Sequence, residues 1–450
     1  MKRILLLGAG KSATCLIDYL VKELKKNDWQ LTLCDADLAL AKSKIKSAEN
    51  TDAVSINVED EHSRKKLVQS ADIVISMLPP ALHFLIAKDC VQFGKNLLTA
   101  SYVDENIKSL EKQIADKNLL FLCEMGLDPG IDHMSAMKMI NSIKAQGGVI
   151  NSFISHCGGL IAPESDNNLW HYKITWNLRN IVLAGKDGAE YLKENKTVKI
   201  PYKSIFRNCP PVTVIDNYPL CWYPNRDSLH YIDLYGLQGI STFIRTTLRH
   251  PAFCRGWNKF VNIGLTDTSD HEQVKNCKTF ENWFDVKTAP FTENKKDWNN
   301  YLQIYITDLY KNEFNRQMNF LGLESNDKLP DNYKSSADIL QHLLEKKLAI
   351  NPADKDMIVM LHEVEYTVNL PTGQAGSQRS TVNSSLIVKG EDSLKTAMAK
   401  TVGLPLGIAT KLILQDKIKL SGLHIPIVSE IYEPVLSELE EHGIKFDEFS

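Results

Sequence analysis

The sequence predicts an α/β fold whose N-terminal part is a doubly wound parallel sheet. Three observations predict it: a glycine-rich turn after a short apolar run, an acidic residue at the end of the next apolar run, and regular alternation of strand-like and helix-like segments over the first 125 residues. The length of 450 residues suits about two to three domains. The net charge of −3 gives no reason to expect a nucleic-acid partner.

The first apolar run and its glycine turn, residues 4–13, are typical of a dinucleotide-binding βαβ unit. Gly8 allows the tight turn, Gly10 lets the backbone approach a pyrophosphate, and Ala13 takes the place of the third glycine, where strand and helix pack closely. The pyrophosphate would lie on the backbone N–H groups of a helix that begins near Lys11. We therefore expect a Rossmann domain.

Asp35 ends the second apolar run and distinguishes between cofactors. A carboxylate at this place accepts hydrogen bonds from the ribose hydroxyls and repels a 2′-phosphate, which prefers an arginine. Residues 35–45 contain no arginine, and Lys42 and Lys44 lie further along the expected helix. We therefore expect NAD as the cofactor, with NADP as the second possibility.

Six strands are expected in the N-terminal part, at 3–7, 31–35, 53–57, 72–77, 96–99 and 119–123, with helices between them, for example 12–24 and 38–48. Beyond residue 124 we expect a helix at 132–146, a strand at 149–157, a mostly helical stretch at 225–350, and strands at 357–370 and 381–388 joined through Thr372-Gly373. Residues 404–414 have helical spacing and would fold back onto the first domain.

Motifs along the chain resemble the saccharopine dehydrogenase family of the glutamate-forming type. The most specific are Leu127–His133 (LDPGIDH) and Cys157–Glu164 (CGGLIAPE). The others follow in the family's order, at 99–103, 172–176, 223–228, 247–249 and the tail 403–409. The chain differs from the family's usual residues at His156, Leu169-Trp170-His171, Asn177, Asn180 and Thr246, which would line or border the cleft and therefore bear on the substrate.

The resemblance implies a reaction and a domain plan. Glutamate condenses with 2-aminoadipate 6-semialdehyde, the imine is reduced with a nicotinamide cofactor to saccharopine, and the reverse reaction releases glutamate. The implied domains are a Rossmann domain at 1–125 joined by helices at 395–450, an α+β substrate and dimerisation domain at 126–230 and 351–394, and a mostly helical insertion at 231–350. The resemblance also implies a homodimer.

Site residues follow from the resemblance and from the chemistry of a substrate with several carboxylates. Guanidinium groups bind carboxylates well, which indicates Arg226 and Arg249, with Arg245 as a weaker candidate. Asp128 would hold the substrate amine, and Tyr102 and His133 would manage protons. For His133, a structural hydrogen-bonding role is an equal alternative. Asp132 would cap a helix. The expected substrate contacts are Ser101, Tyr102, Asp128, Cys157, Arg226, Thr247, Leu248 and Arg249. The expected cofactor contacts are Gly8, Gly10, Lys11, Ser12, Ala13, Asp35, Asn57, Val58, Met77, Leu78, Leu127, Pro129 and Asn177.

Two other functions remain open. One is a related imine reductase such as carboxynorspermidine dehydrogenase, and the other is a non-catalytic NAD-binding sensor. The nine cysteines are scattered, with no CxxC pair and no zinc spacing, so we expect reduced thiols, no metal and a cytoplasmic location. We expect no membrane partner, because the chain has no run of eighteen apolar residues. We also expect no signal peptide, because the short apolar run at residues 4–7 is followed by glycines and not by a cleavage site.

Overall fold

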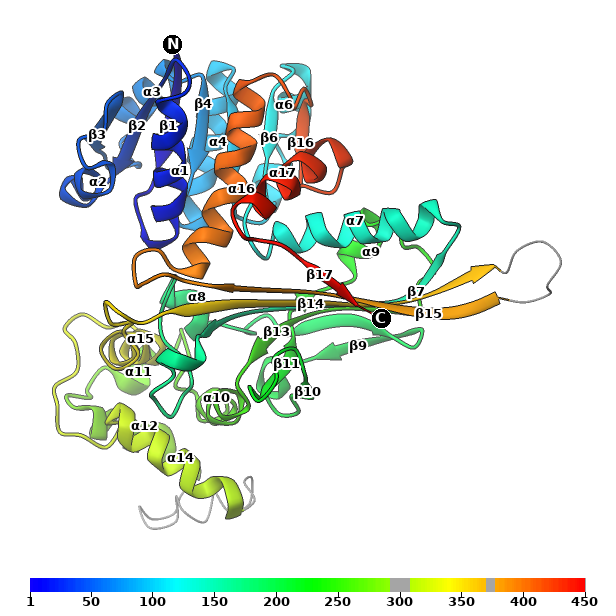
Figure 1. Ribbon diagram of the computed structural model, residues 1–450. Helices are drawn as coiled ribbons and strands as arrows, with labels where there is room; N and C mark the ends of the chain where they lie inside the picture. The colour runs from blue at the N-terminus through cyan, green and yellow to red at the C-terminus, as the bar shows by residue number, and fades with distance from the viewer. Residues whose placement is uncertain (292–307, 370–376, 450) are drawn as a thin grey trace. The chain divides into compact units, whose positions relative to one another are not determined.

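The computed structural model describes residues 1–291, 308–369 and 377–449 (Figure 1). The chain divides into two compact units. The first unit comprises Met1–Ile150, Leu234–Gly236 and His362–Ser450. The second unit comprises Asn151–Asp233 and Leu237–Leu361. The predicted division of the chain into three domains stays a prediction.

A seven-stranded parallel sheet forms the centre of the first unit, in the order β16-β6-β5-β4-β1-β2-β3. Its strands are β1 (Lys2–Leu7), β2 (Trp29–Asp35), β3 (Thr51–Ser55), β4 (Ile73–Ser76), β5 (Asn96–Thr99), β6 (Leu120–Leu122) and β16 (Gly422–His424). The six predicted strands and the predicted doubly wound fold are confirmed. Strand β16 was missed because it has three residues and no apolar run.

Helices connect the strands of this sheet. They are α1 (Thr14–Leu24), α2 (Leu38–Ile45), α3 (Glu61–Ser70), α4 (Pro80–Phe93), α5 (Glu105–Lys108), α6 (Glu111–Asp116) and α7 (Ile131–Ala145), with the 3₁₀ helix η1 (Lys11–Ala13) at the glycine turn. The C-terminal segment adds α16 (Ala397–Leu414) and α17 (Ser429–Glu441).

Helix α16 packs directly against α1, as the fold-back prediction requires (Figure 1). A Cβ added at Gly403 would lie 2.8 Å from the backbone nitrogen of Leu16, and one at Gly407 would lie 2.6 Å from the ring of Tyr19. Glycines therefore allow the close contact. Helix α16 is long and apolar enough to cross a membrane by length and composition, but 83% of it is buried inside the structure, and the core helix of a folded domain passes the same test.

The second unit is built on a mixed sheet. Its strands are β7 (Val149–Ile161), β8 (Ala189–Lys193), β9 (Lys196–Ile200), β10 (Pro211–Val212), β11 (Leu220–Pro224), β12 (Arg226–Asp227), β13 (Thr242–Arg249) and β14 (Asp356–Asn369). The division between the units falls within β7, after Ile150, and within β14, after Leu361. The order is β10-β11-β13-β7-β14, and β8 pairs with β9, β12 and β13. Strand β15 (Ser377–Lys389) pairs with β17 (Asp447–Phe449), and both belong to the first unit. The predicted turn at Thr372-Gly373 lies outside the described residues.

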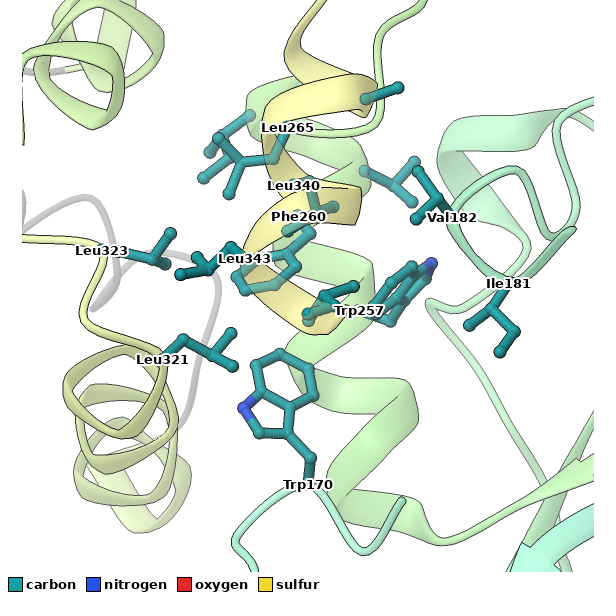
Figure 2. Packing of buried hydrophobic residues seen from close by; sticks show 14 of the residues in the cluster. Trp170, Ile181, Val182, Trp257, Phe260, Leu265, Leu321, Leu323, Leu340 and Leu343 are labelled. Atoms are coloured by element: carbon teal, nitrogen blue, oxygen red, sulfur yellow. The ribbon is translucent and has the colours of Figure 1, made fainter. Parts of the chain in front are cut away.

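The second unit also contains most of the chain's aromatic core. Its helices are α8 (Leu178–Val182), α9 (His230–Leu234), α10 (Pro251–Ile263), α11 (His271–Val274), α12 (Phe280–Thr288), α14 (Asp308–Leu321) and α15 (Ser336–Lys347), with 3₁₀ helices at Pro163–Ser165, Tyr202–Ser204 and Ala289–Phe291. Figure 2 shows Trp170, Trp257 and Phe260 packed together with leucines of the helical region. Trp170 is fully buried and its indole N–H donates to the Gln317 carbonyl at 3.3 Å. Its predicted place beside a cleft is therefore wrong, because the side chain fills the core.

Residues 242–249 form a strand, so the prediction of mostly helical structure over 225–350 is wrong there. Strand β13 lies between β11 and β7. Its sequence, Thr-Phe-Ile-Arg-Thr-Thr-Leu-Arg, has no apolar run, yet most of its residues are buried. The polar side chains find buried partners from other segments, and periodicity within one segment cannot indicate these.

Candidate active site

The glycine turn after β1 has the geometry of a dinucleotide site. Gly8 adopts a φ of +104°, and a Cβ there would lie 2.8 Å from the carbonyl oxygen of Met77. Gly10 is exposed, and a Cβ there would meet nothing within 4 Å. Gly10 is also the N-cap of η1, where no side chain caps the helix start. Backbone N–H groups beside open space suit a phosphate. Lys11, Ser12 and the buried Ala13 make up η1 itself.

Asp35 is the last residue of β2, and its carboxylate lies beside the glycine turn. It accepts hydrogen bonds from the N–H groups of Ala9 at 2.8 Å and Asp37 at 3.0 Å. Arg64, the first arginine after Asp35, is buried and donates to the Asp89 carboxylate at 2.6 Å. The Lys44 ammonium donates to the Thr14 hydroxyl at 2.6 Å. These residues lie where the adenosine half of a nicotinamide dinucleotide would bind.

The remaining predicted cofactor residues of this unit follow β3, β4 and β6. Asn57 and Val58 come after β3, and the Asn57 side chain accepts from the Glu59 N–H at 3.0 Å. Met77 and Leu78 come after β4, and the Met77 N–H donates to the Leu7 carbonyl at 2.8 Å. This bond joins the turn after β4 to the glycine turn. Because the sheet is parallel, all these turns lie at its carboxyl edge, where ligands of open α/β sheets bind.

A buried histidine connects the ends of β4 and β5. His83 of α4 contacts the Ser76 hydroxyl through Nδ1 at 2.8 Å and the Ser101 hydroxyl through Nε2 at 2.7 Å. Burial lowers the pKa of His83 to about 4, so the ring is neutral at pH 7. One ring nitrogen then donates and the other accepts. The chain Ser76–His83–Ser101 fixes the position of Ser101, and the sequence analysis missed it because the three residues share no local motif.

His133 is held inside the first unit. It is fully buried, and its ring contacts the Glu124 carboxylate at 2.8 Å and the Tyr235 hydroxyl at 2.6 Å. Glu124 also accepts from the Val103 N–H at 3.1 Å. Both ring nitrogens are therefore engaged, and His133 acts as a positioning residue. Its predicted role in direct proton exchange with substrate does not fit these contacts, and sequence analysis missed Glu124 and Tyr235.

Asp128 lies in the loop after β6 and is half-buried. The Tyr102 hydroxyl donates to its Oδ1 at 3.5 Å, which is long for a hydrogen bond. Leu127 and Pro129 on either side are buried. The N-cap of α7 is Gly130, so the predicted N-cap role of Asp132 is wrong. Asp132 lies in the first turn of the helix, and its carboxylate accepts from the Gly130 N–H at 2.6 Å.

In the second unit, Cys157, Thr247 and Arg249 lie on one face of the sheet. Thr247 pairs with Cys157 across β13 and β7, and Leu248, between Thr247 and Arg249, is fully buried on the other face. A Cβ at Gly158 would lie 2.6 Å from the Leu248 Cβ, so glycine is needed where these two strands approach. Three predicted substrate residues are thus brought together.

The Arg249 guanidinium is buried in aromatic surroundings. It lies 5.3 Å from the Tyr172 ring centroid and 5.8 Å from that of Phe253, and Nη1 donates to the Leu248 carbonyl at 2.8 Å. Its Nε is buried without a hydrogen-bond partner among the described residues. A buried donor of this kind costs free energy unless it gains an acceptor. Arg249 is therefore suited to an anionic ligand.

The other predicted residues of this unit have different surroundings. Arg226 is exposed with a φ of +52°, on β12, which pairs with β8. Arg245 is buried, with its guanidinium 4.3 Å from the Tyr231 ring centroid. Asn177 caps α8 by accepting from the Arg179 N–H at 2.9 Å. His156 contacts the Thr246 hydroxyl at 2.7 Å on the sheet face opposite Arg249.

Comparison with known proteins matches this chain to one family over nearly all its length. The saccharopine dehydrogenase NADP binding domain matches residues 4–122, and the saccharopine dehydrogenase C-terminal domain matches residues 126–444. The chain belongs to the saccharopine dehydrogenase family.

Individual relatives agree. The saccharopine dehydrogenase [NADP(+), L-glutamate-forming] of Schizosaccharomyces pombe is 30% identical, over 100% of this chain and 99% of its own length. The apo saccharopine dehydrogenase (L-Glu forming) structure from Saccharomyces cerevisiae superposes with a TM-score of 0.88 at 30% identity, covering 100% of this chain and 99% of the yeast chain. The mitochondrial alpha-aminoadipic semialdehyde synthase of Mus musculus is 32% identical over 99% of this chain. This chain spans 47% of that mouse protein, about half its length.

Proposed function

We propose that this chain interconverts saccharopine with L-glutamate and 2-aminoadipate 6-semialdehyde, using a nicotinamide dinucleotide. The observation that carries the proposal is the buried guanidinium of Arg249, with its unpartnered Nε, in a chain of this family. A substrate carboxylate would supply the missing acceptor. Charge-assisted hydrogen bonds of this kind contribute about 1.5–3 kcal/mol each.

The residues of the first unit support the cofactor half of the proposal. The N–H groups at Gly10 and η1 would bind the pyrophosphate, and Asp35 would bind the adenosine ribose. When bound, the cofactor supplies the hydride acceptor or donor. Ser101 is positioned by neutral His83, and Tyr102 and Asp128 present a hydroxyl and a carboxylate to a substrate amine.

Asp128 and Tyr102 would move the amine proton. A carboxylate at Asp128 stabilises a protonated substrate amine and can accept its proton, while the Tyr102 hydroxyl, 3.5 Å away, can donate to Asp128 as the charge there changes. Arg249 would orient the substrate through a carboxylate, and orientation is a large part of what the protein contributes to hydride transfer.

We further propose that NAD is preferred over NADP. The matching domain and the fungal relatives are named for NADP, which favours the phosphorylated cofactor. Asp35 supports the opposite preference here, since a carboxylate beside the glycine turn repels a 2′-phosphate, and the first arginine after it is already paired with Asp89. Values of kcat/KM with both cofactors decide the matter, and a preference for NADP would refute the assignment.

The test of the main proposal is the absorbance of NADH when saccharopine is added to the protein with NAD. We expect reduction of NAD that depends on saccharopine, with glutamate as a product. Tight binding of NAD without turnover would refute the proposal in favour of an NAD-binding sensor, and turnover of a polyamine imine alone would favour a different imine reductase.

Location and assembly complete the proposal. We propose a cytoplasmic homodimer, supported by nine cysteines that are all free thiols and by the implied dimerisation of the family. Light scattering on the purified protein gives the mass in solution, and the mass of a monomer would refute the dimer. Fractionation of cells that express the chain tests its location.

A further inference from the structure

Three cysteines from separate segments meet in the second unit. Their sulfur atoms, in Cys209, Cys221 and Cys254, all lie within 4.8 Å of one another. Cys209 precedes β10, Cys221 lies in β11, and Cys254 lies near the start of α10. We call these three residues the thiol cluster. The proposed reaction does not use it.

The thiol cluster lines a cavity of about 410 Å³. Cys221 and Cys254 are each 2% exposed, whereas Cys209 is partly exposed. Phe206, Pro210 and Arg255 are among the other lining residues. A small ion can therefore reach sulfur atoms that are otherwise buried, and a metal site needs such an entry path.

The spacing of the sulfur atoms suits a metal ion better than a disulfide. With Zn–S bonds of about 2.3 Å, three thiolates in a tetrahedral site lie about 3.8 Å apart. Sulfur atoms within 4.8 Å of one another need to move by only about half an ångström to reach that geometry. A disulfide requires about 2.05 Å between two sulfur atoms and leaves the third without a role.

Positive charge lies beside the cluster. Arg255 lines the same cavity, and a nearby cation favours thiolates. Cys221 is the register partner of Arg249, so the two side chains share a face of the sheet. Three thiolates with one divalent ion carry a net charge of −1. Arg255 also pairs with Glu313 at 2.7 Å.

We propose that Cys209, Cys221 and Cys254 form a three-thiolate site for a soft metal ion, with Zn²⁺ as the ion that the donor set and the sulfur spacing fit best. The fourth ligand is a water molecule from the cavity. The thiolates release their protons when the ion binds, so that affinity rises with pH.

The experiment uses the full chain, reduced and freed of metal with a chelator. Zn²⁺ is titrated in competition with a chromogenic chelator, and X-ray absorption on the zinc-loaded protein counts the sulfur ligands. We expect one ion per chain with three sulfur ligands. Cys221→Ser should weaken zinc binding by more than about 100-fold, beyond the 10–100-fold typical of losing an outer-shell partner. Cys277→Ser is the matched control, because Cys277 is also a buried thiol but does not line the cavity.

Each outcome supports or overturns the site. Failure of the unmodified chain to retain zinc, fewer than three sulfur ligands, or an equal loss of affinity in Cys277→Ser would overturn it. The count of sulfur ligands needs no variant, so it remains decisive if Cys221→Ser does not fold. Cys209→Ser, at the partly exposed position, provides a second test. None of these measurements involves saccharopine, so they succeed or fail independently of the proposed reaction.

Discussion

Gly10→Ala should weaken cofactor binding strongly without harming the fold. Gly10 has φ −61° and ψ −179°, an extended conformation that alanine adopts without strain, and its added Cβ would meet nothing within 4 Å in the protein. The loss of glycine freedom in the unfolded chain should even stabilise the fold, by about 0.4–1 kcal/mol. The methyl group would occupy the space through which a pyrophosphate reaches the backbone N–H groups.

The expected loss of affinity follows from those N–H groups. If the methyl group prevents two charge-assisted hydrogen bonds of about 1.5–3 kcal/mol each, the dissociation constant for the cofactor rises by at least about 100-fold. Calorimetric titration with NAD and NADH measures the affinity. Thermal unfolding without cofactor measures the stability.

Two further glycines give matched controls. Gly94 ends α4 with a φ of +67° and open space around its Cβ position, so Gly94→Ala should cost about 1 kcal/mol of stability and leave the affinity unchanged. Gly8→Ala should lower both the stability and the cofactor affinity, because Gly8 has a φ of +104° and an added Cβ would lie 2.8 Å from the Met77 carbonyl oxygen. Wild-type affinity in Gly10→Ala, or lower stability in that variant than in Gly94→Ala, would refute the placement of the cofactor.

Three further predictions concern substrate binding and pH. Arg249→Met should lower kcat/KM for saccharopine by about 10–150-fold, because it removes a charge-assisted bond of about 1.5–3 kcal/mol, and unchanged steady-state kinetics would contradict this role. Arg226→Ala should raise KM for saccharopine or glutamate about tenfold or more, whereas Lys196→Ala, which removes another exposed cation, should not. His83→Gln should reduce the acid sensitivity of the fold, because the pKa of His83 is about 4 in the folded state and about 6.5 when unfolded. As the pH falls from 6.5 to 4, the free energy of unfolding of the wild type should therefore fall by about 3 kcal/mol relative to that of the variant. Chemical denaturation across that pH range measures the difference. His250, whose pKa burial also lowers to about 4, is present in both proteins and cancels in the difference, and equal pH dependence of the two proteins would contradict the His83 prediction.

The parallel sheet could be predicted because its information is local. Each of β1, β2 and β4 is a short apolar run, and each is followed by a turn residue or an acid at the carboxyl edge. Gly8 and Asp35 identify the dinucleotide site for the same reason, since strand, turn and acid lie in one stretch of chain. The helical spacing of α16 likewise lies in a single segment.

The partners of the site residues could not be predicted in this way. His133 depends on Tyr235, 102 residues away, and Ser101 depends on His83 of another helix. Whether a histidine exchanges protons with a ligand or is held between two side chains depends on such partners. The sequence therefore left both roles of His133 open, and the buried contacts favour the positioning role.

The register of the second unit's sheet explains both Arg249 and the thiol cluster. Cys221 pairs with Arg249 across β11 and β13, and successive residues of each strand point to opposite faces of the sheet. Leu248 therefore packs into one apolar cluster, while Cys221 belongs to the aromatic core on the other face. A slip of one residue would move Arg249 to the side of Leu248 and separate Cys221 from its face. Sequence motifs for metal sites require cysteines a few residues apart. Cys209, Cys221 and Cys254 are further apart than that, so the sequence predicted no metal site here. The same register that buries a guanidinium among aromatic rings also brings a strand cysteine next to a helix cysteine, which is why neither feature is visible until the strands are paired.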